Sequence, residues 1–187
     1  MYKTVVFDLD GTLLNTLTDL ADAGNRLCRK YGWPTHERQA YRYFVGNGIP
    51  KLVERLAPAD QRTPAVLEAA LADFKRDYGQ HLRDTTAPYP GIPEMLAKLK
   101  ANGVQLAVFS NKADALAKEV VKDYFGTQYF TIVRGQMTGV APKPAAEGTN
   151  ALLQALHADP ASTLYVGDSN VDVETAHNAN LPCCGAV

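Results

Sequence analysis

Five short apolar runs, separated by longer stretches with helical spacing, dominate the pattern of this chain. The runs are rich in β-branched and aromatic residues, and most are bounded by glycine or proline; they are Thr4–Asp8, Val104–Ser110, Tyr129–Val133, Leu164–Gly167 and Cys183–Val187. Their weak alternation is typical of parallel strands that are covered on both faces. Each run therefore predicts a buried strand.

Helical patterns lie between these runs. Ile92, Met95, Leu96 and Leu99 are spaced three and four apart, and Gly103 follows as a stop signal. Similar apolar spacing runs from Ala115 to Val121 and from Ala151 to Leu156. Because strands and helices alternate, the sequence predicts an α/β fold with a mostly parallel sheet.

One connection is far longer than a simple crossover. Between the first run and the second, apolar spacing predicts helices over Leu17–Tyr31, Ile49–Leu56 and Val66–Tyr78. Thr16-x-x-Asp19 resembles a capping box at the start of the first helix. We therefore expect a helical domain over residues 15–87, inserted into a core made of residues 1–14 and 88–187. Its place beside the strand ends suits a lid; the alternative is that it only adds core.

The bulk properties narrow the class of protein further. The chain has 187 residues and a formal net charge of −1, so nothing in the total charge indicates a nucleic-acid or membrane partner. An odd number of cysteines, two of them adjacent, argues against a disulfide framework. We read neither a signal peptide nor a membrane span. We expect a soluble cytoplasmic protein, monomeric or homodimeric, that acts on a small molecule.

Polar residues follow the predicted strands where those strands end. Asp8 ends the first run and Asp10 follows it, Ser110 ends the second run and Asn111 follows it, and Asp168 and Asp172 come after the fourth run. Ligands of open α/β sheets bind at this edge, and carboxylates are the ligands that Mg²⁺ prefers. Lys143, between two prolines, would supply the positive charge that a phosphate dianion needs. Gly11 and Thr12 allow a tight turn whose amides face an anion.

Each of these features also has a plainer interpretation. An Asp-x-Asp pair can be a solvated strand end, and Asp168 and Asp172 can be acids that a helix N-terminus favours. Ser110 can be a helix cap and Lys143 an exposed loop lysine. The Gly46–Gly48 segment, which opens an insert helix, can be a simple turn. The occurrence of all the strand-end features in one chain favours the magnesium and phosphate interpretation.

The same segments resemble the four motifs of the haloacid dehalogenase superfamily of phosphatases. The motifs are Asp8-Leu9-Asp10-Gly11-Thr12-Leu13, Ser110-Asn111, Lys143 and Gly167-Asp168-x-x-x-Asp172. The insert is similar to the superfamily's helical cap of the first type, and Val45–Gly48 and Tyr89–Gly91 are similar to phosphoglycolate phosphatases. Two departures stand out. Asn15-Thr16 replaces the usual Asp-Ser, and the sequence stops at Val187, where relatives usually continue.

The resemblance implies a Rossmann-like parallel sheet in the order 5-4-1-2-3 and a phosphoric monoester hydrolase. The activity would be Mg²⁺-dependent hydrolysis of a small phosphate ester, with 2-phosphoglycolate as the best candidate, through an aspartyl-phosphate. Asp8 would be the nucleophile and Asp10 the acid and base, with Ser110 and Lys143 stabilising the phosphoryl group. The implied substrate-binding residues are Gly11, Thr12, Asn111, Gly46, Asn47 and Gly48, and the implied metal site consists of Asp8, Asp10 through its backbone carbonyl, Asp168 and Asp172.

Three alternatives stay open. One is a sugar-phosphate mutase or a pyrophosphatase of the same superfamily, although Thr12 favours a hydrolase because mutase relatives tend to carry an aliphatic residue there. Another is a catalytically inactive protein that binds phosphate or metal. The last is a phosphoaspartate receiver domain, which lacks a large insert after its first strand.

Overall fold

The computed structural model describes residues 1–186 and divides the chain into two compact units. One unit combines Met1–Leu14 with Pro88–Val187, and the other consists of Asn15–Ala87. The two short strands at the junctions, β2 (Leu14–Asn15) and β3 (Ala87–Pro88), form a two-stranded sheet of their own. The roles of catalytic core and cap stay predictions.

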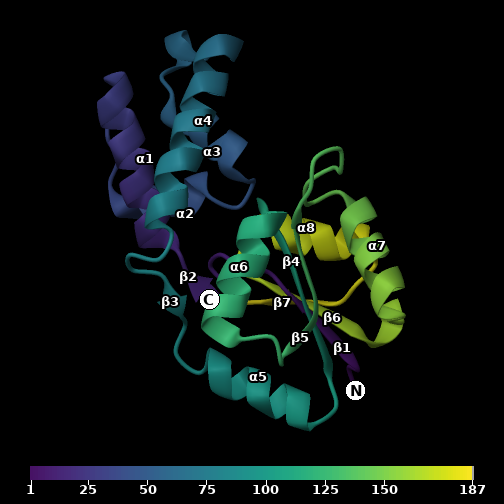
Figure 1. The fold of residues 1–187 in the computed structure, drawn as a ribbon. Coiled ribbons are helices and arrows are strands. Elements are labelled where there is room, and N and C mark those ends of the chain that lie inside the picture. Colours follow the sequence, from purple (N-terminus) through teal and green to yellow (C-terminus); the bar gives the residue numbers. More distant parts are fainter. Residues whose placement is uncertain (187) are drawn as a thin grey trace. The chain divides into compact units, whose positions relative to one another are not determined.

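The first unit is built on a parallel sheet of five strands (Figure 1). These strands are β1 (Thr4–Phe7), β4 (Gln105–Ala113), β5 (Phe130–Gln136), β6 (Thr163–Gly167) and β7 (Cys183–Gly185). Their order is β5-β4-β1-β6-β7, and every pair is parallel. The α/β prediction is confirmed. Only the strand labels differ from the expected order 5-4-1-2-3, because β2 and β3 take two numbers outside this sheet. Val187, expected to end the last strand, lies outside the described residues.

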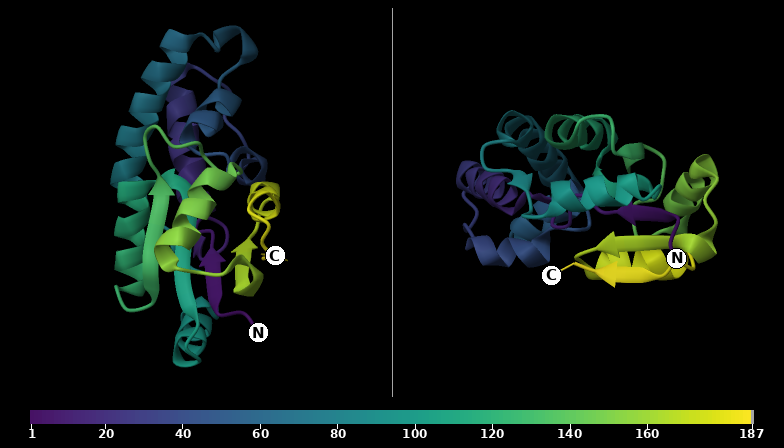
Figure 2. Two further views of the ribbon diagram at one scale, coloured as in Figure 1. Left: turned by 90° about the vertical axis from the view of Figure 1, so that its right-hand side faces the viewer. Right: turned by 90° about the horizontal axis from the view of Figure 1, so that it is seen from below.

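Helices cover both faces of this sheet (Figure 2). On one face, side chains of β1, β4 and β6 pack against α7 (Ala146–Leu156) and α8 (Asn170–Asn178) in a core that includes Val6, Phe109 and Tyr165. Successive strand residues point to opposite faces. α5 (Ile92–Ala101) contacts β4, and α6 (Asp114–Phe125) contacts β4 and β5. Each large apolar side chain buried in this way contributes about 1.5–3 kcal/mol. The sheet edge that carries the polar residues is therefore held by a rigid core.

The second unit is helical. Its helices are α1 (Leu17–Tyr31), α2 (Tyr41–Phe44), α3 (Ile49–Leu56) and α4 (Pro64–His81), with short 3₁₀ segments at Arg38–Ala40 and Ala59–Gln61. α1 and α3 have the predicted bounds. Gly32 ends α1 in the left-handed conformation, at φ 69°. The long α4 has a proline at its first position, which suits a helix start.

The expected capping box at the start of α1 is wrong. Thr16 occupies the N-cap, but its side chain makes no capping hydrogen bond. The Asp19 carboxylate is buried and instead accepts four hydrogen bonds of 2.5 to 2.9 Å from the backbone and hydroxyl groups of Thr85 and Thr86. Asp19 therefore fastens the first turn of α1 to the segment that leaves the helical unit.

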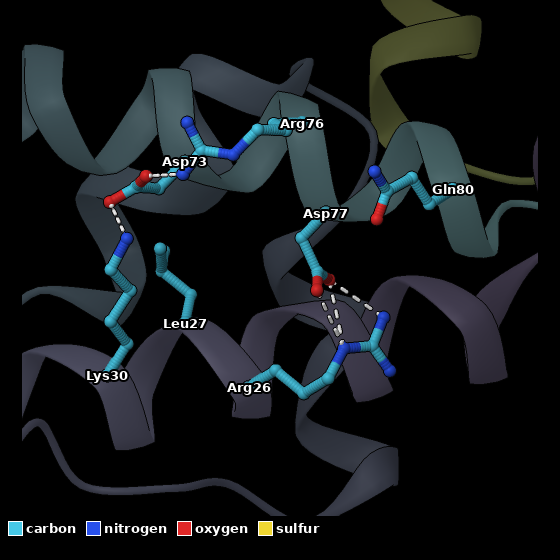
Figure 3. A pocket seen from close by; sticks show the side chains of 7 residues that line it. All are labelled: Arg26, Leu27, Lys30, Asp73, Arg76, Asp77 and Gln80. Carbon is cyan, nitrogen blue, oxygen red and sulfur yellow. Dashed lines mark hydrogen bonds and ion pairs between the residues drawn. The ribbon is translucent and has the colours of Figure 1, made fainter.

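Ion pairs also join α1 to α4, around a cavity of about 170 Å³ (Figure 3). Arg26 and Lys30 of α1 pair with Asp77 and Asp73 of α4, and Arg76 of α4 also pairs with Asp73. Hydrogen bonds from Lys30 and Tyr31 lower the pKa of Asp73 to about 2. Because these bases lie beside acids, the cluster stabilises the contact between the two helices.

None of the helices in the described part of the chain has the length and apolar character needed to span a bilayer.

Candidate active site

Lys143 lies at the centre of the polar cluster at the sheet edge. Its ammonium nitrogen is 2.6 Å from Oδ1 of Asp8, at the end of β1, and 2.8 Å from Oδ1 of Asp172, on α8. It also donates to the Phe109 carbonyl oxygen and to the Tyr165 hydroxyl, at 3.2 and 3.1 Å. The lysine is only 3% exposed, so the plainer reading as a solvated loop residue does not hold.

The charges of this cluster depend on one another. Burial raises the pKa of Asp8 to about 7, against the opposing effect of Lys143. At Asp172 the effect of burial is outweighed by the Lys143 ammonium together with hydrogen bonds from Ser169, which hold the pKa of Asp172 below its ordinary value. Burial lowers the pKa of Lys143, and its carboxylate partners more than compensate, so the lysine stays charged. The site therefore combines a fixed cation with a carboxyl group whose protonation is finely balanced.

A turn of the chain brings Asp168 to the same place. Thr12 donates a hydrogen bond of 2.8 Å to Oδ1 of Asp168. Gly11, at φ 94°, has no room for a side chain, because an added Cβ would lie 2.3 Å from Oδ2 of Asp168. The glycine and threonine after the first strand are thus required by the close approach of Asp168.

Three carboxylates form a group that could hold a cation. One oxygen from each of Asp8, Asp168 and Asp172 lies within 4.8 Å of the others. Both oxygens of Asp172 already have partners, because Oδ2 accepts from the backbone and hydroxyl of Ser169 in a capping box that starts α8. α8 begins at Asn170, so Asp168 precedes the helix, and the two acids do not share its first turn. Asp8 and Asp168 are better placed to be direct ligands, with Asp172 in support.

Asn111 joins β4 to the loop that carries Lys143. Its side-chain oxygen accepts a hydrogen bond of 2.8 Å from the backbone N–H of Lys143, and its side-chain nitrogen donates to the Lys143 carbonyl oxygen at 3.2 Å. This two-way contact fixes the backbone from which the lysine projects. The expected contact of Asn111 with substrate stays a prediction.

Ser110 is buried near the end of β4, and its hydroxyl accepts a hydrogen bond from the backbone N–H of Lys112. It does not cap α6, which begins at Asp114 with Ala113 as its N-cap. Gly46 and Gly48 adopt positive φ angles before α3, and Asn47 accepts a hydrogen bond from Arg55. These three residues belong to the helical unit, and their contact with substrate stays a prediction.

Two further residues belong to the site and were not singled out from the sequence. Lys112 places its ammonium 2.9 and 3.2 Å from the two oxygens of Asp10. Tyr165, fully buried on β6, contacts Lys143 and lies 3.4 Å from Oδ1 of Asp172. For Lys112, strand periodicity was the signal in the sequence, since Lys112 is two residues after Ser110 and points to the same face. For Tyr165, the sequence indicated only a place in an apolar strand.

Comparisons with known proteins agree with this geometry. The sequence model of the haloacid dehalogenase-like hydrolase family matches residues 5–186. A phosphoglycolate phosphatase of Thiobacillus denitrificans is 32% identical over 183 residues, which cover 96% of this chain and 81% of that protein. One from Neisseria meningitidis serogroup A is 33% identical over 186 residues, with 98% and 79% coverage. The crystal structure of a predicted phosphoglycolate phosphatase from Haemophilus somnus is 28% identical, with a TM-score of 0.88 and coverage of 98% and 84%.

Proposed function

Because this chain belongs to the haloacid dehalogenase-like hydrolase family, we propose that it is a Mg²⁺-dependent phosphatase of a small phosphate monoester, with 2-phosphoglycolate as the first candidate. The observation that carries the proposal is the contact of Lys143 with both Asp8 and Asp172, beside Asp168. The two relatives named phosphoglycolate phosphatases, at 32% and 33% identity, support the choice of substrate.

In the proposed reaction, a carboxylate oxygen of Asp8 attacks the phosphorus, and the bond from phosphorus to the organic oxygen breaks. Asp10 gives that oxygen its proton. Water then attacks the aspartyl-phosphate, Asp10 takes the proton of the water, and Asp8 is regenerated. Once ionised, Asp8 needs no separate base to act as a nucleophile, and the Lys143 ammonium favours the ionised form. Lys143 and Ser110 stabilise the charge that spreads over the phosphoryl oxygens.

The acidic residues fit a magnesium site. Asp8 and Asp168 would hold the ion directly, together with the backbone carbonyl of Asp10, while Asp172 supports Asp168 and Lys143. A few carboxylates with several retained waters is the arrangement that Mg²⁺ prefers. When bound, the ion offsets the repulsion between Asp8 and a phosphate dianion.

The remaining predicted residues keep their proposed roles. Amides around Gly11 and Thr12, together with Asn111, would line the phosphate position. Gly46, Asn47 and Gly48 would contact the organic part of the substrate from the helical unit, which acts as the cap. A cytoplasmic monomer or homodimer without nucleic-acid or membrane partners also stays a prediction.

A panel of small phosphate esters, assayed for released phosphate with Mg²⁺ and with a chelator, tests the proposal. We expect Mg²⁺-dependent release, fastest with 2-phosphoglycolate. Isomerised sugar phosphate without free phosphate would identify a mutase, and release from pyrophosphate alone would identify a pyrophosphatase. Binding of beryllofluoride without turnover of any ester would indicate an inactive phosphate-binding protein.

A further inference from the structure

A second buried lysine lies beside the proposed acid and base. The Lys112 ammonium contacts both oxygens of Asp10, and the side chains are only 3% and 16% exposed. Lys143 instead contacts two of the other carboxylates of the site, Asp8 and Asp172, so the two lysines have different acidic partners. An ammonium within hydrogen-bond distance of both oxygens restricts the rotation of the Asp10 carboxylate.

The backbone at Lys112 is held as firmly as its side chain. Its N–H donates to the Ser110 hydroxyl at 3.2 Å. On the neighbouring strand β5, Gly135 lies so close that an added Cβ would be 2.4 Å from the Lys112 carbonyl oxygen. The Gly135 N–H in turn donates to the Asp114 carboxylate at 3.0 Å. These contacts fix the point from which the ammonium reaches Asp10.

We propose that Lys112 is a positioning residue for Asp10. It holds the carboxyl group where its protonated form faces the leaving oxygen of the substrate and its ionised form later faces the attacking water. The inference rests on the proposed phosphatase function and deepens it. Lys112 is assigned no contact with the phosphoryl group, which distinguishes its role from that of Lys143.

A purely structural ion pair would have a different kinetic effect from a positioning residue. An alkyl phosphate such as 2-phosphoglycolate releases a basic alkoxide that needs a proton, whereas p-nitrophenyl phosphate releases a stable phenolate that needs little help. The value of kcat/KM reports the steps up to the first irreversible one, which includes departure of the leaving group. Loss of positioning therefore slows the alkyl ester selectively, while loss of folded protein slows both esters equally.

The test compares kcat/KM for these two esters in the wild type and in Lys112→Met, with saturating Mg²⁺. Because general acid catalysis contributes about 10²–10⁴-fold, we expect the variant to lose about 10- to 100-fold with 2-phosphoglycolate and less than about 3-fold with p-nitrophenyl phosphate. Lys100→Met is the matched control. It removes an exposed lysine of the same unit, on α5, and should leave both values unchanged.

The ratio of the two values does not depend on the folded fraction. Lys112→Gln should give the same ratio and replaces the methionine variant if that protein is insoluble. An equal loss on both esters, or no loss on either, would overturn the positioning role. Absence of turnover of both esters by the wild type would overturn the proposed phosphatase function, and this inference with it.

Discussion

Replacing Lys143 with methionine should destabilise the protein strongly, and added Mg²⁺ should reverse much of the loss. The lysine is 3% exposed and lies between Asp8 and Asp172, which are 7% and 1% exposed. Removing one partner of such a buried pair leaves charge without compensation and costs about 3–5 kcal/mol. A divalent cation beside the same carboxylates can take over part of this role, so the variant should gain more from Mg²⁺ than the wild type.

The loss of stability in Lys143→Met should also depend on pH. Burial raises the pKa of Asp8 to about 7 even with Lys143 opposing it, and the substitution would raise it further. A carboxyl group whose pKa is raised on folding favours the folded state below its unfolded pKa, about 4, and this contribution disappears as the pH rises through the folded pKa. The variant should therefore differ most from the wild type above neutral pH and approach it in mild acid.

Urea denaturation followed by circular dichroism, with chelator or Mg²⁺, at about pH 5 and about pH 8, measures these effects. Lys118→Met, which removes an exposed helix pair, should lose no more than about 0.5 kcal/mol. A loss of less than about 1 kcal/mol for Lys143→Met at the higher pH without Mg²⁺ would refute the reasoning, since a buried pair is then not being broken. Equal stabilisation of the wild type and Lys143→Met by Mg²⁺ would refute the idea that the cation takes over part of the role of Lys143.

Three further predictions concern other parts of the molecule. Gly11→Ala displaces Asp168 and should lower kcat/KM on the order of 100-fold with little loss of helicity; an active variant would show that this close approach is unimportant. Asp19→Asn places an NH₂ group against backbone N–H donors and should lower the free energy of unfolding, measured with urea, by about 2–4 kcal/mol. The exposed Asp22→Asn should lower it hardly at all, and equal losses would contradict the role of Asp19. Asp73, with a pKa of about 2, should stabilise the fold above about pH 4 and lose this effect towards pH 2, so melting curves of Asp73→Asn should meet those of the wild type in acid; a constant difference would exclude the linkage.

The strands and helices could be read from the sequence because their signals are local. Gly32 marks the end of α1 at the predicted residue, and the apolar spacing of α3 matches its bounds. Residues at strand ends could be grouped because parallel strands end at the same edge of a sheet. The structure brings Asp8, Asp168 and Asp172 together there.

Contacts between distant segments could not be read in the same way. Asp19 resembles a capping residue, but its partners Thr85 and Thr86 lie at the far end of the insert, and nothing near Asp19 marks them. Lys112 carries only a weak signal, its period-two relation to Ser110. Its pairing with Asp10 depends on the register of β4 beside β1, which the sequence does not specify.

The most direct test of the account is to trap the phosphorylated enzyme. Wild-type protein mixed with Mg²⁺ and 2-phosphoglycolate, quenched in acid within a turnover and digested, should show the mass of one phosphoryl group on the peptide that carries Asp8. The Asp8→Asn variant should fold normally, show no such peptide and release no phosphate. Phosphorylation of a different residue, or Mg²⁺-dependent turnover that persists in Asp8→Asn, would contradict the assignment of Asp8 as the nucleophile.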